Sequence, residues 1–288
     1  MDKWAEWLLK KRFGGNEEIY KKTMEFMSGI RDRVLDAAKI EPGNTVLDVG
    51  CGDGLLAMGA LERVGLEGKV IFSDISESCI EHCKQFATGN SEFVVAGAED
   101  LSAIPDASVD AVVIRSVLIY IQDKEKALAE IHRVLKPGGR FSFFEPINSF
   151  SEQGKPDSKT MIFGVDASEI PGMAEILEKI KAQREARKGA DAPMMDFDER
   201  DLLEKVKAAG FAKVKLVYEA QIDSTYMQPP YDTILHSVPN PNAISLHETL
   251  DRALTPDERK VFEDFVRPRM HLTPVTMRQA LAYVSAEK

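Results

Sequence analysis

The chain is poor in cysteine and contains no long apolar run. Its three cysteines, Cys51, Cys79 and Cys83, are too few for a disulfide framework and fit a reducing compartment. No segment approaches the ~20 consecutive apolar residues of a membrane span, and the N-terminal segment lacks the apolar core of a signal peptide. These absences predict a cytoplasmic protein with no membrane partner.

The chain also has fewer basic residues than acidic ones. Lys and Arg number 37 against 47 Asp and Glu, which gives a formal net charge of −10. A surface with that balance repels the phosphates of a nucleic acid and the headgroups of an anionic membrane. Cys79 and Cys83 lie four residues apart, but two thiols alone make a poor metal site, because structural zinc takes about four ligands. We predict neither a nucleic-acid partner nor a bound metal.

The first half of the chain alternates apolar runs with amphipathic segments. This alternation predicts strands joined by helices, and it is typical of a parallel sheet covered on both faces. Right-handed crossovers then give a doubly wound sheet. The predicted strands are 44–50, 69–75, 92–97, 109–121 and 140–146, and the predicted helices are 55–65, 77–87 and 124–136.

The second half follows a less regular pattern. Residues 149–160 are polar and loop-like, 198–211 are amphipathic, and 212–222 alternate as a strand does. Thr255 and Glu258 form a capping box that opens a helix, and residues 278–288 predict a last strand. We therefore predict one α/β domain, 1–288, with a doubly wound, Rossmann-like, mostly parallel sheet of seven strands. Helical cap insertions are expected at 147–197 and 223–275.

The segment VLDVGCGDGLL, residues 46–56, ends the first predicted strand with three glycines at alternate positions. Glycine adopts positive φ readily and lets a ligand approach the backbone closely. A strand, a glycine turn and a helix together form a ligand site at the carboxyl edge of an α/β sheet. The turn lacks a lysine, which excludes a P-loop. Leu55 occupies the third-glycine position of a dinucleotide-binding turn, which disfavours that motif.

Asp74 ends the second predicted strand, downstream of this turn. A carboxylate at that place accepts hydrogen bonds from both hydroxyls of a ribose. Nicotinamide dinucleotide sites and S-adenosylmethionine sites share this arrangement, so Asp74 alone leaves both open. S-adenosylmethionine has no phosphate and carries a sulfonium cation, which suits a turn without Lys or Arg and with acidic neighbours.

Over residues 30–146 the chain resembles the class I S-adenosylmethionine-dependent methyltransferases of the small-molecule, single-domain type. The segments that carry the resemblance keep the family's order and spacing. They are VLDVGCGDG (46–54), FSDIS (72–76), GAEDL (97–101), PDASVDAVV (105–113), HRVLKPGGRF (132–141) and EP (145–146). The resemblance implies S-adenosyl-L-methionine as cofactor and methyl transfer to a small organic acceptor by in-line displacement.

Carried over by position, the resemblance also implies a cofactor site, with residues 1–40 forming helices over it. Asp74 would bind the ribose diol and Ile75 would pack on the adenine. Gly97 stands where the family often has an aspartate, so we expect Glu99 or Asp100 to contribute in its place. The residues expected at the cofactor are Tyr20, Asp48, Gly50, Cys51, Gly52, Asp74, Ile75, Ala98, Glu99, Arg115 and Ser116.

Methyl transfer from a sulfonium needs alignment and desolvation above all, because the donor is already activated. A general base helps when the acceptor is a hydroxyl, a thiol or an ammonium. The candidate catalytic residues are Arg115 and Tyr120 near the end of the fourth strand, and His236 and His271 in the second half. Arg115 would either anchor an acidic substrate or pair with Glu145 on the neighbouring strand.

The acceptor is expected to be a small organic molecule held under the cap. RSVL at 115–118 differs from the Asn-Pro-Pro-Tyr of many methyltransferases that act on amide or base nitrogens. Several apolar residues of the cap would line an adaptable pocket: Met161, Phe163, Met173, Met194, Met195, Tyr226 and Met227. Two other functions stay open, a nicotinamide-dependent Rossmann oxidoreductase and a non-catalytic module that binds the same cofactor.

Overall fold

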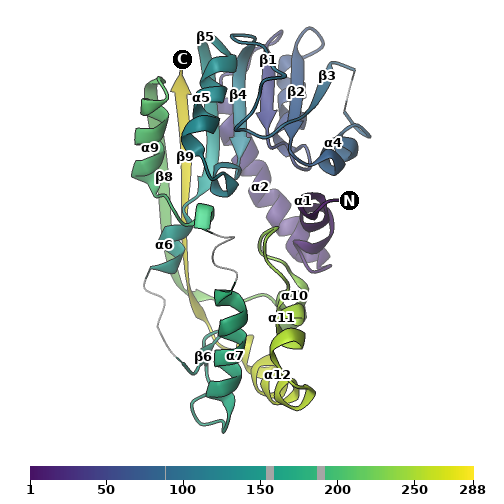
Figure 1. Cartoon of the computed structure of the whole chain (residues 1–288), viewed down its shortest axis with the longest axis vertical. Coiled ribbons are helices and arrows are strands. Elements are labelled where there is room, and N and C mark those ends of the chain that lie inside the picture. Colours follow the sequence, from purple (N-terminus) through teal and green to yellow (C-terminus); the bar gives the residue numbers. More distant parts are fainter. Residues whose placement is uncertain (88, 154–158, 187–191) are drawn as a thin grey trace.

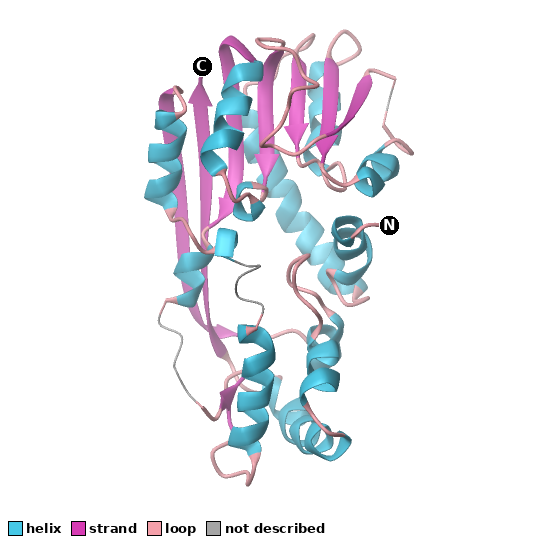
Figure 2. Cartoon of the chain, viewed as in Figure 1, coloured by secondary structure: helices cyan, strands magenta, loops and turns pink. Residues whose placement is uncertain are grey.

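The computed structural model describes residues 1–87, 89–153, 159–186 and 192–288. One sheet, covered by helices on both faces, forms one end of the molecule, and a lobe of helices forms the other (Figures 1 and 2). Two long strands run from the sheet toward the lobe and connect the two regions (Figure 1). Parts of the loop predicted at 149–160 and of the cap predicted at 147–197 lie outside the described residues.

The sheet has seven strands in the order β3-β2-β1-β4-β5-β9-β8. The first five are parallel, while β9 runs antiparallel to both β5 and β8. This confirms the predicted fold class, and the order reverses between β1 and β4, where such sheets bind ligands. The strands are β1 (Thr45–Val49), β2 (Lys69–Asp74), β3 (Ser91–Val95), β4 (Val109–Arg115), β5 (Leu135–Pro146), β8 (Ala212–Tyr226) and β9 (Val275–Glu287).

Each face of the sheet has its own apolar core. On one face α5 (Lys124–Val134) and α9 (Glu199–Ala208) pack against the strands. On the other lie α2 (Glu17–Ala37), α3 (Leu55–Val64) and α4 (Glu77–Cys83). Because successive side chains of a strand point to opposite faces, Val46 joins the second core and Leu47 the first. This double coverage explains the continuous apolar strand runs.

The helical lobe is built from segments far apart in the sequence. It contains the two-stranded ladder of β6 (Met161–Ile162) and β7 (Val165–Asp166), together with α7 (Met173–Glu185), α10 (Tyr231–His236), α11 (Leu246–Ala253) and α12 (Pro256–Met270). Their buried side chains, including Met173, Leu250 and Phe262, form a third core, separate from the two that cover the sheet. Capping boxes at Ser245 and Thr255 open α11 and α12, as the sequence predicts for the latter.

The N-terminal segment closes over the carboxyl edge of the sheet. It comprises α1 (Lys3–Glu6) and a π-helical turn, η1 (Trp7–Lys11). The Asp2 carboxylate accepts a hydrogen bond from Ser76 Oγ at 2.7 Å, next to the end of β2. Trp7 Nε1 donates to the carbonyl of Val238 at 2.8 Å, in the loop after α10. The segment therefore bridges the sheet and the chain that leads into the lobe.

Two strand boundaries differ most from the prediction, while β8 continues to Tyr226 and β9 begins at Val275, a few residues beyond the predicted limits. The fourth strand ends at Arg115 instead of continuing to 121, because Ser116 has a φ of 56° and a short 3₁₀ turn, η2 (Leu118–Tyr120), follows. The fifth strand starts earlier, at Leu135, and runs through the Pro-Gly-Gly segment. Among the described residues, no helix combines the length and the apolar character needed to cross a membrane. The described side chains also form no group of His, Cys, Asp and Glu suited to holding a metal ion.

Candidate active site

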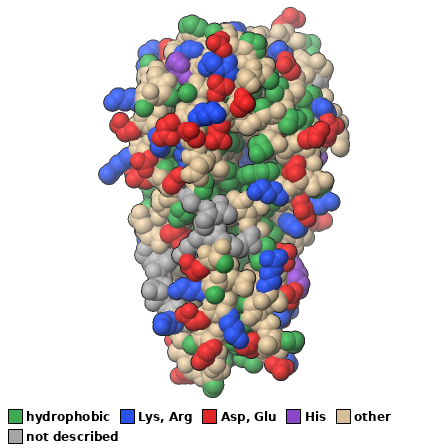
Figure 3. Space-filling view, viewed as in Figure 1, with side chains coloured by type: hydrophobic (Ala, Val, Ile, Leu, Met, Phe, Trp, Pro, Cys, Tyr) green, Lys and Arg blue, Asp and Glu red, His purple; other side chains and the backbone are tan. Residues whose placement is uncertain are grey.

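A cavity of about 370 Å³ opens at the carboxyl edge of the sheet, beneath the N-terminal segment. Hydrophobic side chains gather at the middle of the face between the sheet and the lobe, whereas charged side chains of both signs are spread over its two ends (Figure 3). The lining comes from the glycine turn, the ends of β2, β4 and β5, the N-terminal segment, α2 and β9. The cavity therefore joins the cofactor edge predicted from the sequence to an apolar wall next to it.

The three glycines of the turn have the backbone that their spacing predicts. Gly50, Gly52 and Gly54 have φ values of 70°, 54° and 84°, in the left-handed region that side-chain-bearing residues rarely adopt. A Cβ on Gly50 would lie 2.4 Å from a methyl carbon of Val117. The N–H groups of Gly50 and Cys51 both donate to the Ser73 carbonyl, at 2.7 and 2.9 Å. The turn is thus a bare backbone cradle held against β2.

Asp74, the last residue of β2, lies beside this cradle. Its carboxylate accepts hydrogen bonds from the N–H of Gly52 at 2.9 Å and of Ser76 at 2.8 Å. Burial raises its pKa, and the side chain lines the cavity. A carboxylate offers about four lone-pair sites, so acceptor capacity remains for a ligand diol. Ile75 follows with 58% of its surface exposed, which presents an apolar face to the same cavity. These groups fit a ribose and a purine.

Two fully buried carboxylates support the walls of the cavity. Asp48 accepts from the N–H of Ala57 at 2.9 Å, at the start of α3, and burial raises its pKa to about 7. Glu145 accepts from the N–H groups of Val117 and Leu118 at 2.9 and 2.8 Å, and burial raises its pKa to about 7 as well. Glu145 therefore holds the turn after β4, and its predicted pairing with Arg115 is wrong.

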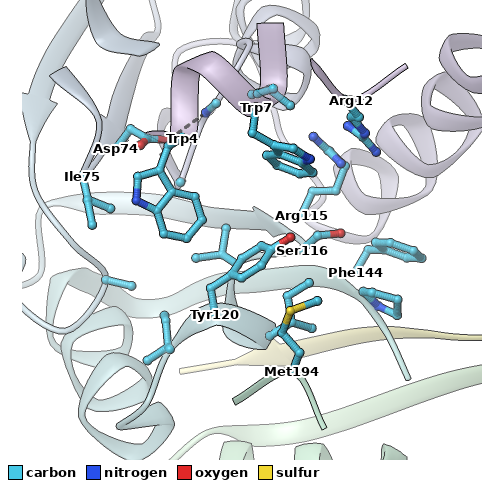
Figure 4. A pocket seen from close by; sticks show the side chains of 18 of the residues that line it. Trp4, Trp7, Arg12, Asp74, Ile75, Arg115, Ser116, Tyr120, Phe144 and Met194 are labelled. Carbon is cyan, nitrogen blue, oxygen red and sulfur yellow. Dashed lines mark hydrogen bonds between the residues drawn. The ribbon is translucent and has the colours of Figure 1, made fainter. Parts of the chain in front are cut away.

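The turn after β4 carries local backbone strain. Ser116 has positive φ although it is not glycine, a conformation that costs on the order of 1 kcal/mol and persists only when the surroundings enforce it. Its N–H donates to the Phe144 carbonyl at 2.9 Å, and the Glu145 carboxylate holds the next residues. The strained residue lines the cavity next to Arg115 (Figure 4).

Aromatic side chains from the N-terminal segment form the roof. Trp4 and Trp7 both meet Tyr120 edge to face, with ring centres 5.1 and 6.4 Å apart. Trp4 lies on the side of Asp74 and Ile75, and Trp7 lies toward Arg12 and Arg115 (Figure 4). Leu8 covers the glycine turn, because a Cβ on Gly52 would lie 2.9 Å from its Cδ2. The sequence shows Trp4, Trp7 and Leu8 on one helical face, but it does not show where that face docks.

The structure brings most of the predicted cofactor residues to this cavity. Those that line it are Gly50, Gly52, Asp74, Ile75, Ala98, Glu99, Arg115 and Ser116, together with the catalytic candidate Tyr120. Asp48 and Cys51 are buried in the core behind the turn and do not line it. Tyr20 is also absent from the lining, since 51% of its surface is exposed and its ring meets Phe13 at 5.3 Å.

The two histidine candidates lie elsewhere. His236 is exposed at the end of α10, where its ring lies 5.3 Å from that of His247. His271 is exposed just after α12. None of the described residues that line the cavity is a histidine. Of the seven apolar residues predicted to line a pocket under the cap, only Met194 does so. Met173 is buried in the lobe core and Phe163 packs against it, Tyr226 ends β8, and Met161, Met195 and Met227 are exposed.

Sequence comparison places this site in a family. A family model described as a methyltransferase domain matches residues 47–143. The ubiquinone/menaquinone biosynthesis C-methyltransferase UbiE of Hydrogenovibrio crunogenus is 31% identical over 210 residues, which cover 70% of this chain and 79% of that protein. The UbiE of Francisella tularensis subsp. novicida is 42% identical over 136 residues, covering 46% of this chain and 50% of the relative.

Solved structures share the fold at low sequence identity. The YcgJ protein of Bacillus subtilis has a TM-score of 0.53 and 18% identity, with 90% of this chain and 98% of that chain covered. A putative methyltransferase from Haloferax volcanii, solved with the Trm112 methyltransferase activator, has a TM-score of 0.53 and 20% identity, with 99% and 98% covered.

The chain belongs to the class I S-adenosylmethionine-dependent methyltransferases, and its cofactor is S-adenosyl-L-methionine. Family membership decides against the nicotinamide-dependent alternative, and it makes the chain an enzyme rather than a non-catalytic module.

Proposed function

We propose that the chain transfers the methyl group of S-adenosylmethionine to a small organic acceptor bound in the cavity under Trp4 and Trp7. The observation that carries this proposal is the continuity of one cavity. The glycine turn and Asp74 line one part of it, and an apolar wall of Phe26, Met27, Phe144 and Leu281 lines the rest. A donor and an acceptor bound side by side there would share one desolvated space.

We assign the adenosine end of the cofactor to the β2 side of the cavity. Asp74 would accept from the ribose hydroxyls, Ile75 would pack against the adenine, and Ala98 and Glu99 would border it. Glu99 is suited to this edge because its carboxylate is held by the N–H of Asp123 at 3.1 Å. Asp100 is not part of the cavity lining, so Glu99 is the better substitute for the aspartate that Gly97 replaces.

We assign the methionine end to the glycine turn and to the residues after β4. Gly50 and Gly52 would admit the ligand against bare backbone, and Arg115 and Ser116 would lie beside the tail. Asp48 and Cys51 would act from behind, since Asp48 fixes the start of α3 and Cys51 anchors the turn to β2. Tyr20 lies away from the lining, and we give it no part in binding.

The cofactor supplies a methyl group already activated by the sulfonium, so the chain contributes alignment and exclusion of water. Trp4, Trp7 and Leu8 cover the cavity and shield it from solvent. Tyr120 is held edge-on by both tryptophans, and we assign it to positioning the acceptor. With no histidine among the described lining residues, alignment rather than proton abstraction would supply most of the rate.

Two further observations support a small acceptor. The sequence relatives described above are named for methylation in ubiquinone and menaquinone biosynthesis, and the chain spans 79% of one of them and about half of several others. The net charge of −10 opposes a nucleic-acid substrate. Cys51, Cys79 and Cys83 are all buried free thiols, which suits the reducing cytoplasm where we place the reaction.

A transfer assay tests the proposal. The purified chain, S-adenosylmethionine labelled in its methyl group and an extract would be incubated together, and the products would be separated by size. We expect the label in the small-molecule fraction, and we expect Gly50→Val to abolish the transfer. Label in the protein or RNA fraction that depends on an intact Gly50 would overturn the proposed acceptor class while leaving the methyltransferase assignment intact.

A further inference from the structure

Two arginines meet at one end of the cavity. Arg12 follows η1, and its guanidinium carbon lies 5.4 Å from the ring centre of Trp7 and 5.2 Å from that of Phe13. Arg115 is the last residue of β4. Figure 4 shows the two guanidinium groups next to each other, on the far side of the cavity from Asp74 and Ile75. Segments more than 100 residues apart in the chain thus place two positive charges at one point.

Neither guanidinium has a carboxylate partner within ion-pair distance among the described residues. Arg115 instead donates to the sulfur of Met27 at 3.7 Å. Several other arginines are paired, for example Arg63 with Asp36 and Arg133 with Glu130, each at 2.8 Å. Burial and the positive charge of Arg115 lower the pKa of Arg12, and Asp53 is the carboxylate that opposes this effect. A partly buried guanidinium beside a second positive charge, with no ion-pair partner for either, is unfavourable, so an anion bound to both would stabilise this end of the cavity.

A charge count shows what is missing. The charged side chains that line the cavity are Arg12, Arg115, Asp74 and Glu99, and they sum to zero. Asp48 lies behind the turn, where burial favours its neutral form. The cofactor adds one net positive charge, because the ammonium of its tail balances the carboxylate and the sulfonium remains. The lining side chains and the cofactor together therefore carry one excess positive charge, and the two arginines lie at one end of the cavity. Asp53, which lies outside the lining, is the acidic side chain that acts on Arg12.

We propose that the acceptor carries an acidic group, a carboxylate or a phosphate, which Arg12 and Arg115 bind together. The inference rests on the proposed function and narrows its substrate class. Guanidinium groups form paired, charge-assisted hydrogen bonds with such anions, and one anion restores the charge balance of the cavity. The apolar part of the acceptor packs on Phe26, Met27, Phe144 and Leu281, which line the cavity. The acceptor is accordingly an amphipathic organic acid.

The carboxylate of the cofactor's amino-acid tail is the other anion that the two arginines could bind. It brings its own ammonium and therefore leaves the net excess of positive charge unchanged. The experiment separates the two sources by using ligand pairs that differ in one acidic group. S-adenosylhomocysteine has the amino-acid tail and 5′-methylthioadenosine lacks it. Octanoate and octanamide share an alkyl chain, and only octanoate is charged.

Binding is read from the fluorescence of Trp4 and Trp7, the two tryptophans of the chain, both of which line the cavity. The full chain loaded with S-adenosylhomocysteine is titrated with octanoate and with octanamide. We expect octanoate to bind at least about tenfold more tightly, and we expect Arg12→Gln and Arg115→Gln each to remove most of that preference. Arg200→Gln, on an exposed arginine of α9, is the matched control and should keep the preference in full.

The same variants are then titrated with the two nucleosides. We expect Arg12→Gln to leave the ratio of affinities for S-adenosylhomocysteine and 5′-methylthioadenosine nearly unchanged. Because Arg115 also borders the cofactor tail, we expect Arg115→Gln to lower that ratio by less than it lowers the octanoate preference. If Arg12→Gln and Arg115→Gln lower that ratio and leave the octanoate preference unchanged, the arginines serve the cofactor tail and the inference is overturned. Absence of any preference in the wild-type chain overturns it too. Failure of the wild-type chain to bind S-adenosylhomocysteine would instead contradict the proposed function.

Discussion

The sheet and the helical lobe differ in how strictly their roles determine which amino acids they contain. In the sheet, the cofactor site that we propose uses the backbone itself at Gly50 and Gly52, where φ is positive, and one carboxylate at the end of β2. In the lobe, helices are held by an apolar core around Phe262 and Met173, and many apolar sequences would fill that core. The family model accordingly covers 47–143 and stops before the lobe. Cofactor binding requires particular residues at particular positions. A supporting lobe requires mainly that apolar residues recur at the buried positions of its helices.

The largest expected effect tests whether the lobe core is independent of the cofactor site. Phe262→Ala removes a fully buried ring of α12 and should lower the free energy of unfolding by about 3–5 kcal/mol. Since no residue of α12 lines the cavity, the affinity for S-adenosylhomocysteine should stay nearly unchanged. Denaturant unfolding and calorimetric titration measure the two quantities.

Phe141→Ala is the matched control, because it removes an equally buried ring from the sheet core. It should destabilise the chain to a similar extent and also weaken cofactor binding. Equal losses of affinity in the two variants would show that lobe and sheet respond as one unit.

The next effect concerns the glycine cradle. Gly50→Ala forces a Cβ into positive φ and against Val117, so we expect a loss of about 2–4 kcal/mol in unfolding free energy together with loss of nucleoside binding. Gly29→Ala is the control. Gly29 lies in α2 with open space around its Cα, and alanine there should stabilise the chain by about 0.5–1 kcal/mol. If Gly50→Ala still binds the nucleoside, the glycine turn is not the surface against which the cofactor lies.

Asp74 gives a smaller effect on binding, together with some loss of stability, because its carboxylate also accepts from the N–H groups of Gly52 and Ser76. Asp74→Ala should weaken S-adenosylhomocysteine binding by about 1.5–3 kcal/mol, the range for hydrogen bonds to a charged group. Asp100→Ala serves as control, because Asp100 is exposed and lies outside the cavity lining. Titration calorimetry of both variants decides the assignment. Unchanged affinity in Asp74→Ala would show that this carboxylate does not bind the ribose.

The last effect is a pH dependence that originates in Asp48. Burial raises its pKa from 3.8 to about 7. Between these two values the folded chain holds a proton that the unfolded chain has released, so this carboxyl makes stability fall as pH rises through that window. Asp48→Asn removes the titration and keeps the shape. The variant should therefore gain stability relative to wild type on going from pH 5 to pH 8, as measured by unfolding at both values.

The reverse trend, with Asp48→Asn losing ground as pH rises, would mean that Asp48 is ionised at low pH in the folded chain. Burial also raises the pKa of Glu145 to about 7. Glu145 therefore changes the stability of the wild type and of Asp48→Asn with pH in the same way, and its effect cancels when the two proteins are compared.

Sequence reasoning was accurate where a function depends on neighbouring residues. The apolar strand runs, the glycine turn and Asp74 at the end of β2 all follow from local backbone requirements, and the structure places them as predicted. It was less accurate where the outcome depends on distant partners. Arg115 lies free of Glu145, because the backbone N–H groups after β4 occupy that carboxylate. His236 and His271 lie on the lobe, away from the cavity.

The sequence by itself determined the doubly wound sheet and the cofactor edge, because alternating apolar runs and positive-φ glycines leave few other arrangements for the chain. Only the tertiary structure decided what closes that edge. The docking of Asp2 on Ser76 and of Trp7 on Val238 carries Trp4, Trp7 and Arg12 over the cavity, next to Arg115. Such contacts join residues far apart in the chain. The apolar periodicity of the N-terminal segment or of its partner segments, taken alone, therefore does not predict them.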